Sequence, residues 1–425
     1  MTSPRPTAAS RELRVALGLA LGPAVALGLA RFAYALLLPS MRADLGWSFA
    51  VAGAMNTANA GGYLGGALLA ATIARRVGAR RSFIVGLAVS VAALGASAST
   101  GNLAALLGLR ILVGAAGALS FVAGAGLVAQ LDTGTGPSRA PLLLGVYFAG
   151  GGAGIVVSGL TIPVLLTHTN GDGWRAGWLL LAGLAAVALA GSIPAVRAAH
   201  EAPATPAGAD RWPARGMAAL IAAYTFFGAG YIAYMTFIVA FLEGHGASPG
   251  AVSGFWVTLG VAAVAAGFGW GPILPRFRGG KGPAMPMAVV TAGALLPLLS
   301  QSTPVAFASA VFFGASFISV VTAVTALARS SLLRRHWTAA IGALTTAFAV
   351  GQCGGPLLAG LLSDGPDGIR AGLALSVGVL AAATLVVLAQ PERQRRLPPA
   401  RSAPRTRGAT ADQVTIVDDH VIPQG

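Results

Sequence analysis

The sequence predicts an all-α membrane protein with twelve transmembrane helices, divided into two halves of six. Three observations support this prediction. Hydrophobic residues make up 55% of the chain and charged residues 10%, whereas a soluble domain carries about 25% charged residues. The apolar runs reach the length of about 20 residues that a helix needs to cross a bilayer. Residues also recur at a constant offset of 200 positions, which indicates an internal duplication.

Breaks that are charged or rich in glycine and proline separate the apolar runs. The predicted spans are 14–39, 49–74, 82–99, 103–130, 141–166, 177–196, 216–242, 250–274, 284–300, 304–328, 338–362 and 370–390. We therefore expect a tail at 1–12, an N-terminal lobe at 13–196, a linker at 197–214, a C-terminal lobe at 215–390 and a tail at 391–425. The linker is polar and rich in alanine and proline, which favours flexibility. The last tail is rich in arginine and proline, which favours disorder.

The basic residues predict the orientation, because cytoplasmic loops of membrane proteins carry an excess of lysine and arginine. Most of the 28 basic residues fall on the side that holds the N-terminus, the linker and the C-terminal tail. The opposite loops hold only Arg42, Arg175 and Arg370. Both termini are therefore expected in the cytoplasm. Lys281 is the only lysine, a bias typical of GC-rich bacterial genomes, so we expect a bacterial inner-membrane protein.

The duplication is visible in four regions that keep one register. Each of these residues matches the residue 200 positions later: Gly28, Ala33, Tyr34, Arg76, Gly114, Phe148, Ala149, Gly151 and Gly154. Many secondary transporters are built from such repeats, with the substrate site near the bilayer midplane where the repeats meet.

Two motifs carry a family resemblance. The loop after the second span contains Arg76, Gly78 and Arg80 in the stretch ATIARRVGARR, and span 4 contains Arg110, Gly114 and Gly117 in RILVGAAG. Together with the division into six and six spans, these motifs resemble the major facilitator superfamily. The resemblance implies two pseudo-twofold lobes that alternate access to one site, with these six residues in structural or coupling roles. Arg75 stands where the superfamily has an aspartate, which leaves its usual charge latch without that carboxylate.

Shorter stretches resemble the bacterial YbfB/YjiJ-type group within that superfamily. They are Ala30–Tyr34 through Pro39, Gly230–Ile232 through Phe237, and Gly351–Gln352 with Gly355–Pro356.

Arg31 is the strongest candidate for a substrate contact. It lies about three residues from the centre of the first span, where a cation costs roughly 2.5–3.5 kcal/mol on insertion scales and usually faces a cavity or a partner. A guanidinium can bind a carboxylate or phosphate through two hydrogen bonds. Its spacing to Pro39 also resembles the organophosphate exchangers of the superfamily, in which that arginine binds the anion. The alternative is an arginine that only caps backbone carbonyls.

Other polar residues inside the spans are predicted to complete the substrate site. These are Tyr34, Asn59, Tyr231, Tyr234 and Gln352. Tyr34 follows Arg31 by three residues, which places it on the same face of a regular α-helix. None of the 13 acidic residues is central in a span, so we expect an anionic substrate to neutralise Arg31.

The predicted function is secondary active transport of a small organic anion, either coupled to protons or by exchange. A proton-driven exporter of drugs or other lipophilic solutes is one alternative, and a membrane sensor that transports nothing is another. The sequence shows no Cys/His cluster for a metal, no nucleotide-binding loop, no nucleophile–base set and no single basic face for nucleic acid. We expect no cofactor, no enzymatic activity and a monomer in the lipid bilayer.

Overall fold

A computed structural model describes residues 8–131, 139–169, 171–201 and 212–391. Over these residues the regular secondary structure is helical throughout. Most of the predicted N-terminal tail, the middle of the predicted linker and nearly all of the tail at 391–425 lie outside the described residues.

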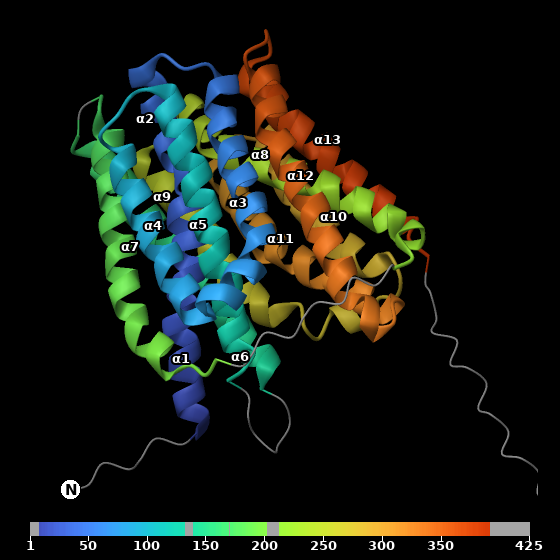
Figure 1. Cartoon of the computed structure of the whole chain (residues 1–425). Helices are drawn as coiled ribbons and strands as arrows, with labels where there is room; N and C mark the ends of the chain where they lie inside the picture. The colour runs from blue at the N-terminus through green and yellow to red at the C-terminus, as the bar shows by residue number, and fades with distance from the viewer. Residues whose placement is uncertain (1–7, 132–138, 170, 202–211, 392–425) are drawn as a thin grey trace, which may run out of the picture. The chain divides into compact units, whose positions relative to one another are not determined.

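Seventeen helical segments follow one another along the described residues, and Figure 1 shows their arrangement. The N-terminal half contains α1 (Ala8–Pro23), η1 (Ala24–Phe32), α2 (Tyr34–Leu45), α3 (Phe49–Val77), α4 (Ala79–Ser97), α5 (Leu103–Val128), α6 (Ala140–Thr167) and α7 (Gly173–Ala198). The C-terminal half contains η2 (Ala214–Met217), α8 (Ala218–Gly244), α9 (Pro249–Gly269), η3 (Leu274–Arg276), α10 (Lys281–Leu299), α11 (Thr303–Ser331), η4 (Arg334–His336), α12 (Trp337–Ser363) and α13 (Gly368–Leu388).

The first span departs from a regular α-helix. Between α1 and α2 the segment η1 is a π-helix, in which the Ala33 N–H bonds the Gly28 carbonyl five residues back at 3.0 Å. It begins directly after Pro23, which has no N–H to donate. Because π-segments shift the helical register and often mark functional sites, the residues after η1 face directions that three- and four-residue spacing does not predict.

In the described part of the chain, eleven helical stretches are long and apolar enough to cross a membrane, of which the first joins α1, η1 and α2. The helix α3, with 29 residues, is long enough but is not among them. It carries Asn56, Thr57 and Asn59, which lower its hydropathy. This composition fits its position, because α3 packs against α5 on one side and α12 on another.

The two halves repeat the same local structure. Gly46 and Gly246 both have a positive φ, at 64° and 82°, where a Cβ would be strained. Two residues later, the hydroxyls of Ser48 and Ser248 accept hydrogen bonds from Val51 N and Ala251 N at 3.3 and 3.2 Å, and so cap α3 and α9. The contact of α3 with α5 has its counterpart in the contact of α9 with α11.

Two pairs of helices make the most extensive contacts between the halves. The helix α3 lies beside α12 near the middle of the view in Figure 1, and α6 packs against α9. Small residues permit these close approaches. A Cβ on Gly53 would overlap the Pro356 carbonyl, and one on Gly152 would overlap the Gly260 carbonyl.

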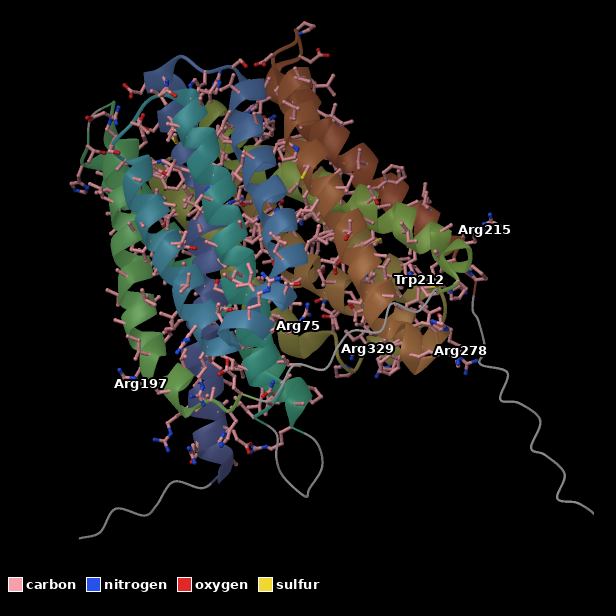
Figure 2. The ribbon with its side chains drawn as sticks, viewed as in Figure 1. Arg75, Arg197, Trp212, Arg215, Arg278 and Arg329 are labelled. Carbon is pink, nitrogen blue, oxygen red and sulfur yellow. The ribbon has the colours of Figure 1, made fainter. Side chains whose placement is uncertain are left out.

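Arginines gather toward one end of the bundle. Figure 2 shows Arg75, Arg197, Arg278 and Arg329 in the lower part of the view, in or beside the ends of helices from both halves. The short connection between α2 and α3 lies toward the opposite end (Figure 1). This distribution matches the charge asymmetry of the sequence.

Candidate functional site

Arg31 lies in the interior of the helical bundle, 3% exposed. Its Nη2 donates a hydrogen bond of 2.7 Å to Oε1 of Gln352 on α12. Its Nε is buried and has no hydrogen-bond partner. The guanidinium also stands 5.3 Å from the centre of the Tyr63 ring on α3. Arg31 therefore joins the two halves and keeps donor capacity for a further ligand.

Gln352 connects Arg31 to the residue at its own repeat position. The Gln352 amide nitrogen donates a hydrogen bond of 2.7 Å to the hydroxyl of Tyr231 on α8. Tyr231 and Gln352 are 4% and 1% exposed. Three residues that the sequence selected for substrate binding, from η1, α8 and α12, thus meet in one hydrogen-bonded chain.

Arg110 is the other buried charged side chain among the described residues. Its donors are occupied by Ala30 O at 2.6 Å, Met55 O at 3.4 Å and Asn56 Oδ1 at 3.0 Å. The Asn56 amide in turn donates 2.7 Å to Thr236 Oγ1 on α8. Each buried arginine therefore reaches the other half through a neutral amide, but only Arg31 retains an unpaired buried donor.

Tyr34, Tyr234 and Asn59 lie outside the Arg31 chain. The Tyr34 hydroxyl bonds the Ala52 carbonyl at 2.8 Å, and its ring stacks on Trp178. Tyr234 shares a 2.6 Å hydrogen bond with Ser309, and Asn59 donates 3.3 Å to the Arg110 carbonyl.

The π-segment accounts for the position of Tyr34. Because Arg31 lies in this π-segment and Tyr34 begins α2, α-helical spacing does not fix the direction of Tyr34 relative to Arg31. The Arg110 guanidinium lies over the Tyr34 ring, 5.0 Å from the centre of that ring.

The predicted structural motif around Gly78 has a carboxylate that the sequence analysis missed. Gly78 has a φ of 91° and ends α3. Oε1 of Glu201 accepts a hydrogen bond of 2.9 Å from Arg80 N at the start of α4, and the Arg80 guanidinium bonds the Ala199 carbonyl. A carboxylate after α7 thus caps α4. Arg76 is exposed.

The glycines of span 4 lie where helices approach closely. A Cβ on Gly114 would overlap the Asn59 carbonyl of α3, whereas one on Gly117 would make ordinary contact with Ala26 of η1. Gly114 therefore permits the close approach of α3 and α5.

Aromatic rings flank Arg31 from both halves. The N-terminal aromatic cluster consists of Tyr63, Phe121, Tyr147 and Phe148. The C-terminal aromatic cluster consists of Tyr224, Phe227, Tyr231, Phe317 and Phe348. Phe348 was not selected from the sequence, although its repeat match to Phe148 marked it.

One end of the α3–α12 contact is closed by Asp364, a second residue that sequence reasoning missed. Its Oδ1 and Oδ2 accept hydrogen bonds from Phe49 N at 2.7 Å and Ala50 N at 3.0 Å, at the N-terminus of α3. Arg42 stands 3.7 Å from the centre of the Phe49 ring.

The pKa of Asp364 follows from these contacts. Partial burial raises it, but the hydrogen bonds from Ala50 N, Phe49 N and the Ser48 hydroxyl, with the charge of Arg42, outweigh burial and bring the pKa below its usual value. We call this pairing of Asp364 with the α3 N-terminus the Asp364 latch.

A separate cleft of about 570 Å³ lies between α2, α6, α8 and α9, with Glu243 and Ser40 among its lining residues. None of the residues predicted to bind substrate lines this cleft. Within the described part of the chain, no three His, Cys, Asp or Glu residues are grouped as a metal site would need.

Comparison with solved structures gives the class of the fold. The nucleoside transporter NupG, crystallised as a point mutant, matches with a TM-score of 0.73 and 12% identity over 88% of this chain and 99% of its own. A bacterial homologue of the human lysosomal transporter Spinster, crystallised inward-facing and unoccupied, matches with a TM-score of 0.68 and 14% identity over 91% and 97%. No curated protein matches the sequence.

The fold is therefore shared with these solved transporters, and the eleven membrane-length helices among the described residues indicate a multi-pass membrane protein. The family model described as the uncharacterised MFS-type transporter YbfB matches residues 23–388, and the chain belongs to that family. The resemblance seen in the sequence is thereby confirmed.

Proposed function

We propose that the protein is a secondary active transporter that moves a small organic anion across the bacterial inner membrane, and that Arg31 binds the anionic group. The observation that carries the proposal is a cation 3% exposed with an unpaired Nε, held by one neutral partner, Gln352. Such a charge in a membrane interior is costly. An anion accepting from Arg31 and from Tyr231 would neutralise it.

The transport mechanism in this proposal is alternating access between two six-helix lobes. In this proposal α3 also crosses the membrane and brings the number of spans to twelve. Two features support it. The repeat partners Tyr34 and Tyr234 pack on corresponding helices, Tyr34 beside Arg110 of α5 and Tyr234 beside Ser309 of α11. The Arg31–Gln352–Tyr231 chain also crosses from one half to the other, so a ligand bound there would contact both halves.

The orientation in this proposal places both termini in the cytoplasm and the Asp364 latch on the opposite side of the membrane. The arginines near the lower helix ends in Figure 2 support it, because basic residues favour the cytoplasmic face. The proposed transporter works as a monomer, and it is driven either by protons or by exchange of one substrate for another. Counterflow with and without a pH gradient in proteoliposomes distinguishes them.

The test uses the purified full chain and a thermal-shift screen of small carboxylates, organophosphates and lipophilic cations. For the ligand found, Arg31→Ala is expected to weaken binding tenfold or more, because a hydrogen bond to a charged group contributes about 1.5–3 kcal/mol. Arg31→Lys is expected to restore little, because lysine lacks the planar fork. Arg215→Ala, at an exposed arginine of η2, is the control.

The opposite result would overturn the proposal. If Arg31→Ala binds the anion as well as the wild type does, Arg31 is structural. Selective binding of lipophilic cations would favour the drug exporter instead.

A further inference from the structure

The rings beside Arg31 form two surfaces from different halves. On the N-terminal side, Tyr63 faces the guanidinium and lies 6.4 Å from Phe121 between ring centres, and Phe121 lies 5.6 Å from Phe148. Tyr63, Phe121 and Phe148 are only half-buried. Each of these residues therefore keeps part of its surface free of protein contacts, although Arg31 beside them is buried.

The C-terminal surface is a stack of nearly parallel rings. Tyr231 and Phe348 lie 5.4 Å apart at an angle of 9°, and Tyr224 and Phe348 lie 4.6 Å apart at 14°. Phe348 is half-buried. Parallel stacks extend readily by one further flat ring, because aromatic pairs favour offset stacking.

The charge available at this place is a single positive one. Arg110, the other buried cation among the described residues, already donates to Ala30, Met55 and Asn56. A phosphate monoester carries close to two negative charges above a pKa of about 6. One of these would stay uncompensated in a low-dielectric interior, which is costly. A group with one negative charge matches the site.

From these observations, which deepen the function proposed above, we infer that the substrate is an aromatic monocarboxylate. Its carboxylate accepts hydrogen bonds from Arg31 and from the Tyr231 hydroxyl. It replaces part of the hydrogen bonding between Gln352 and these two residues. Its ring stacks on the half-buried faces of Tyr63 and Phe348. The charge thus selects the carboxylate, and the two aromatic clusters select a flat ring.

Four probes separate the parts of this inference when their binding to the purified full chain is measured by calorimetry at pH 7.5. Cyclohexanecarboxylate has the same charge as benzoate but no flat ring. Phenyl phosphate keeps the flat ring but carries a second negative charge, and benzamide keeps the ring but carries no charge. Benzoate is expected to bind at least tenfold tighter than each of the others. Phe348→Leu and Tyr63→Leu are each expected to reduce the preference for benzoate over cyclohexanecarboxylate to less than threefold.

Phe312→Leu is the matched control, because Phe312 is 46% exposed on α11 and belongs to neither cluster. It should keep the full preference, and thermal unfolding verifies that each variant is folded. Equal binding of benzoate and cyclohexanecarboxylate, tighter binding of phenyl phosphate, or binding of none of the four probes would overturn the aromatic monocarboxylate. Equal binding of benzamide and benzoate would overturn the anion transporter itself.

Discussion

Removal of the Asp364 carboxylate should loosen the contact between α3 and α12. The carboxylate accepts two backbone hydrogen bonds at the N-terminus of α3, from Phe49 N at 2.7 Å and from Ala50 N at 3.0 Å, in addition to the cap that Ser48 provides. Hydrogen bonds to charged groups contribute about 1.5–3 kcal/mol when buried, and a charge at a helix N-terminus about 0.3–1 kcal/mol. Asp364 is exposed to solvent, so we expect a total of about 1–2 kcal/mol. That energy changes the ratio of closed to open molecules by roughly 5–30-fold.

Spin labels measure this ratio. In a Cys353→Ser background, labels at Ala43 and Pro366, both exposed at this end of the bundle, report the distance between the halves by double electron–electron resonance. Asp364→Asn is expected to add a population at longer distance. Asp367→Asn is the matched control, because Asp367 precedes α13 and its side chain makes no capping hydrogen bond there. An unchanged distance distribution in Asp364→Asn would refute the latch.

The same labels test the pH dependence. Because the pKa of Asp364 is lowered in the closed state, the latch stabilises that state above the usual aspartate pKa of about 3.9 and is lost as the pH falls through the lowered value. We therefore expect no change in the closed population between pH 5 and pH 8. A pH-dependent opening within that range would show that a different group controls it.

Three further predictions concern the rest of the chain. Arg110→Met should lower the unfolding temperature, at a cost of about 3 kcal/mol or more, because it leaves buried carbonyls unpaired; an unchanged temperature would contradict its structural role. Gly28→Ala should destabilise by about 1–3 kcal/mol through overlap with the α6 backbone, whereas Gly65→Ala, with nothing within 4 Å of its Cβ, should not. In cells, a cysteine at Gly246 should react with an impermeant maleimide from outside and one at Ala79 only after permeabilisation, and the reverse pattern would reject the orientation.

The sequence predicted the helices well because their signals are local. The predicted span 103–130 corresponds to α5 at Leu103–Val128, and 338–362 corresponds to α12 at Trp337–Ser363. Apolar runs bounded by capping and breaking residues mark such helices directly. The first span was predicted as one regular helix, whereas the structure inserts the π-segment Ala24–Phe32.

The structure brings together some of the residues selected from the sequence, and their role in binding substrate stays a prediction. Arg31, Tyr231 and Gln352 stood out because polar groups are costly in a membrane, and the structure brings these three together. Tyr34 was placed beside Arg31 by α-helical spacing, which the π-segment breaks. Asp364 was overlooked because it lies in a loop, where a single acid has no local pattern. Its role depends on an N-terminus 315 residues away in the chain.

The neutral amides that tie each buried arginine to the opposite half bear on the speed of the transport cycle. Gln352 holds Arg31, and Asn56 links Arg110 to Thr236. Separating two opposite charges from 4 Å at an effective dielectric constant of 20 costs about 4 kcal/mol, and a carboxylate in either position would add this work to every opening. An amide carries no net charge, so the empty protein can exchange between its conformations without breaking an ion pair. In the alternating-access cycle proposed above, the rate of the return step would then depend on helix packing and on the Asp364 latch.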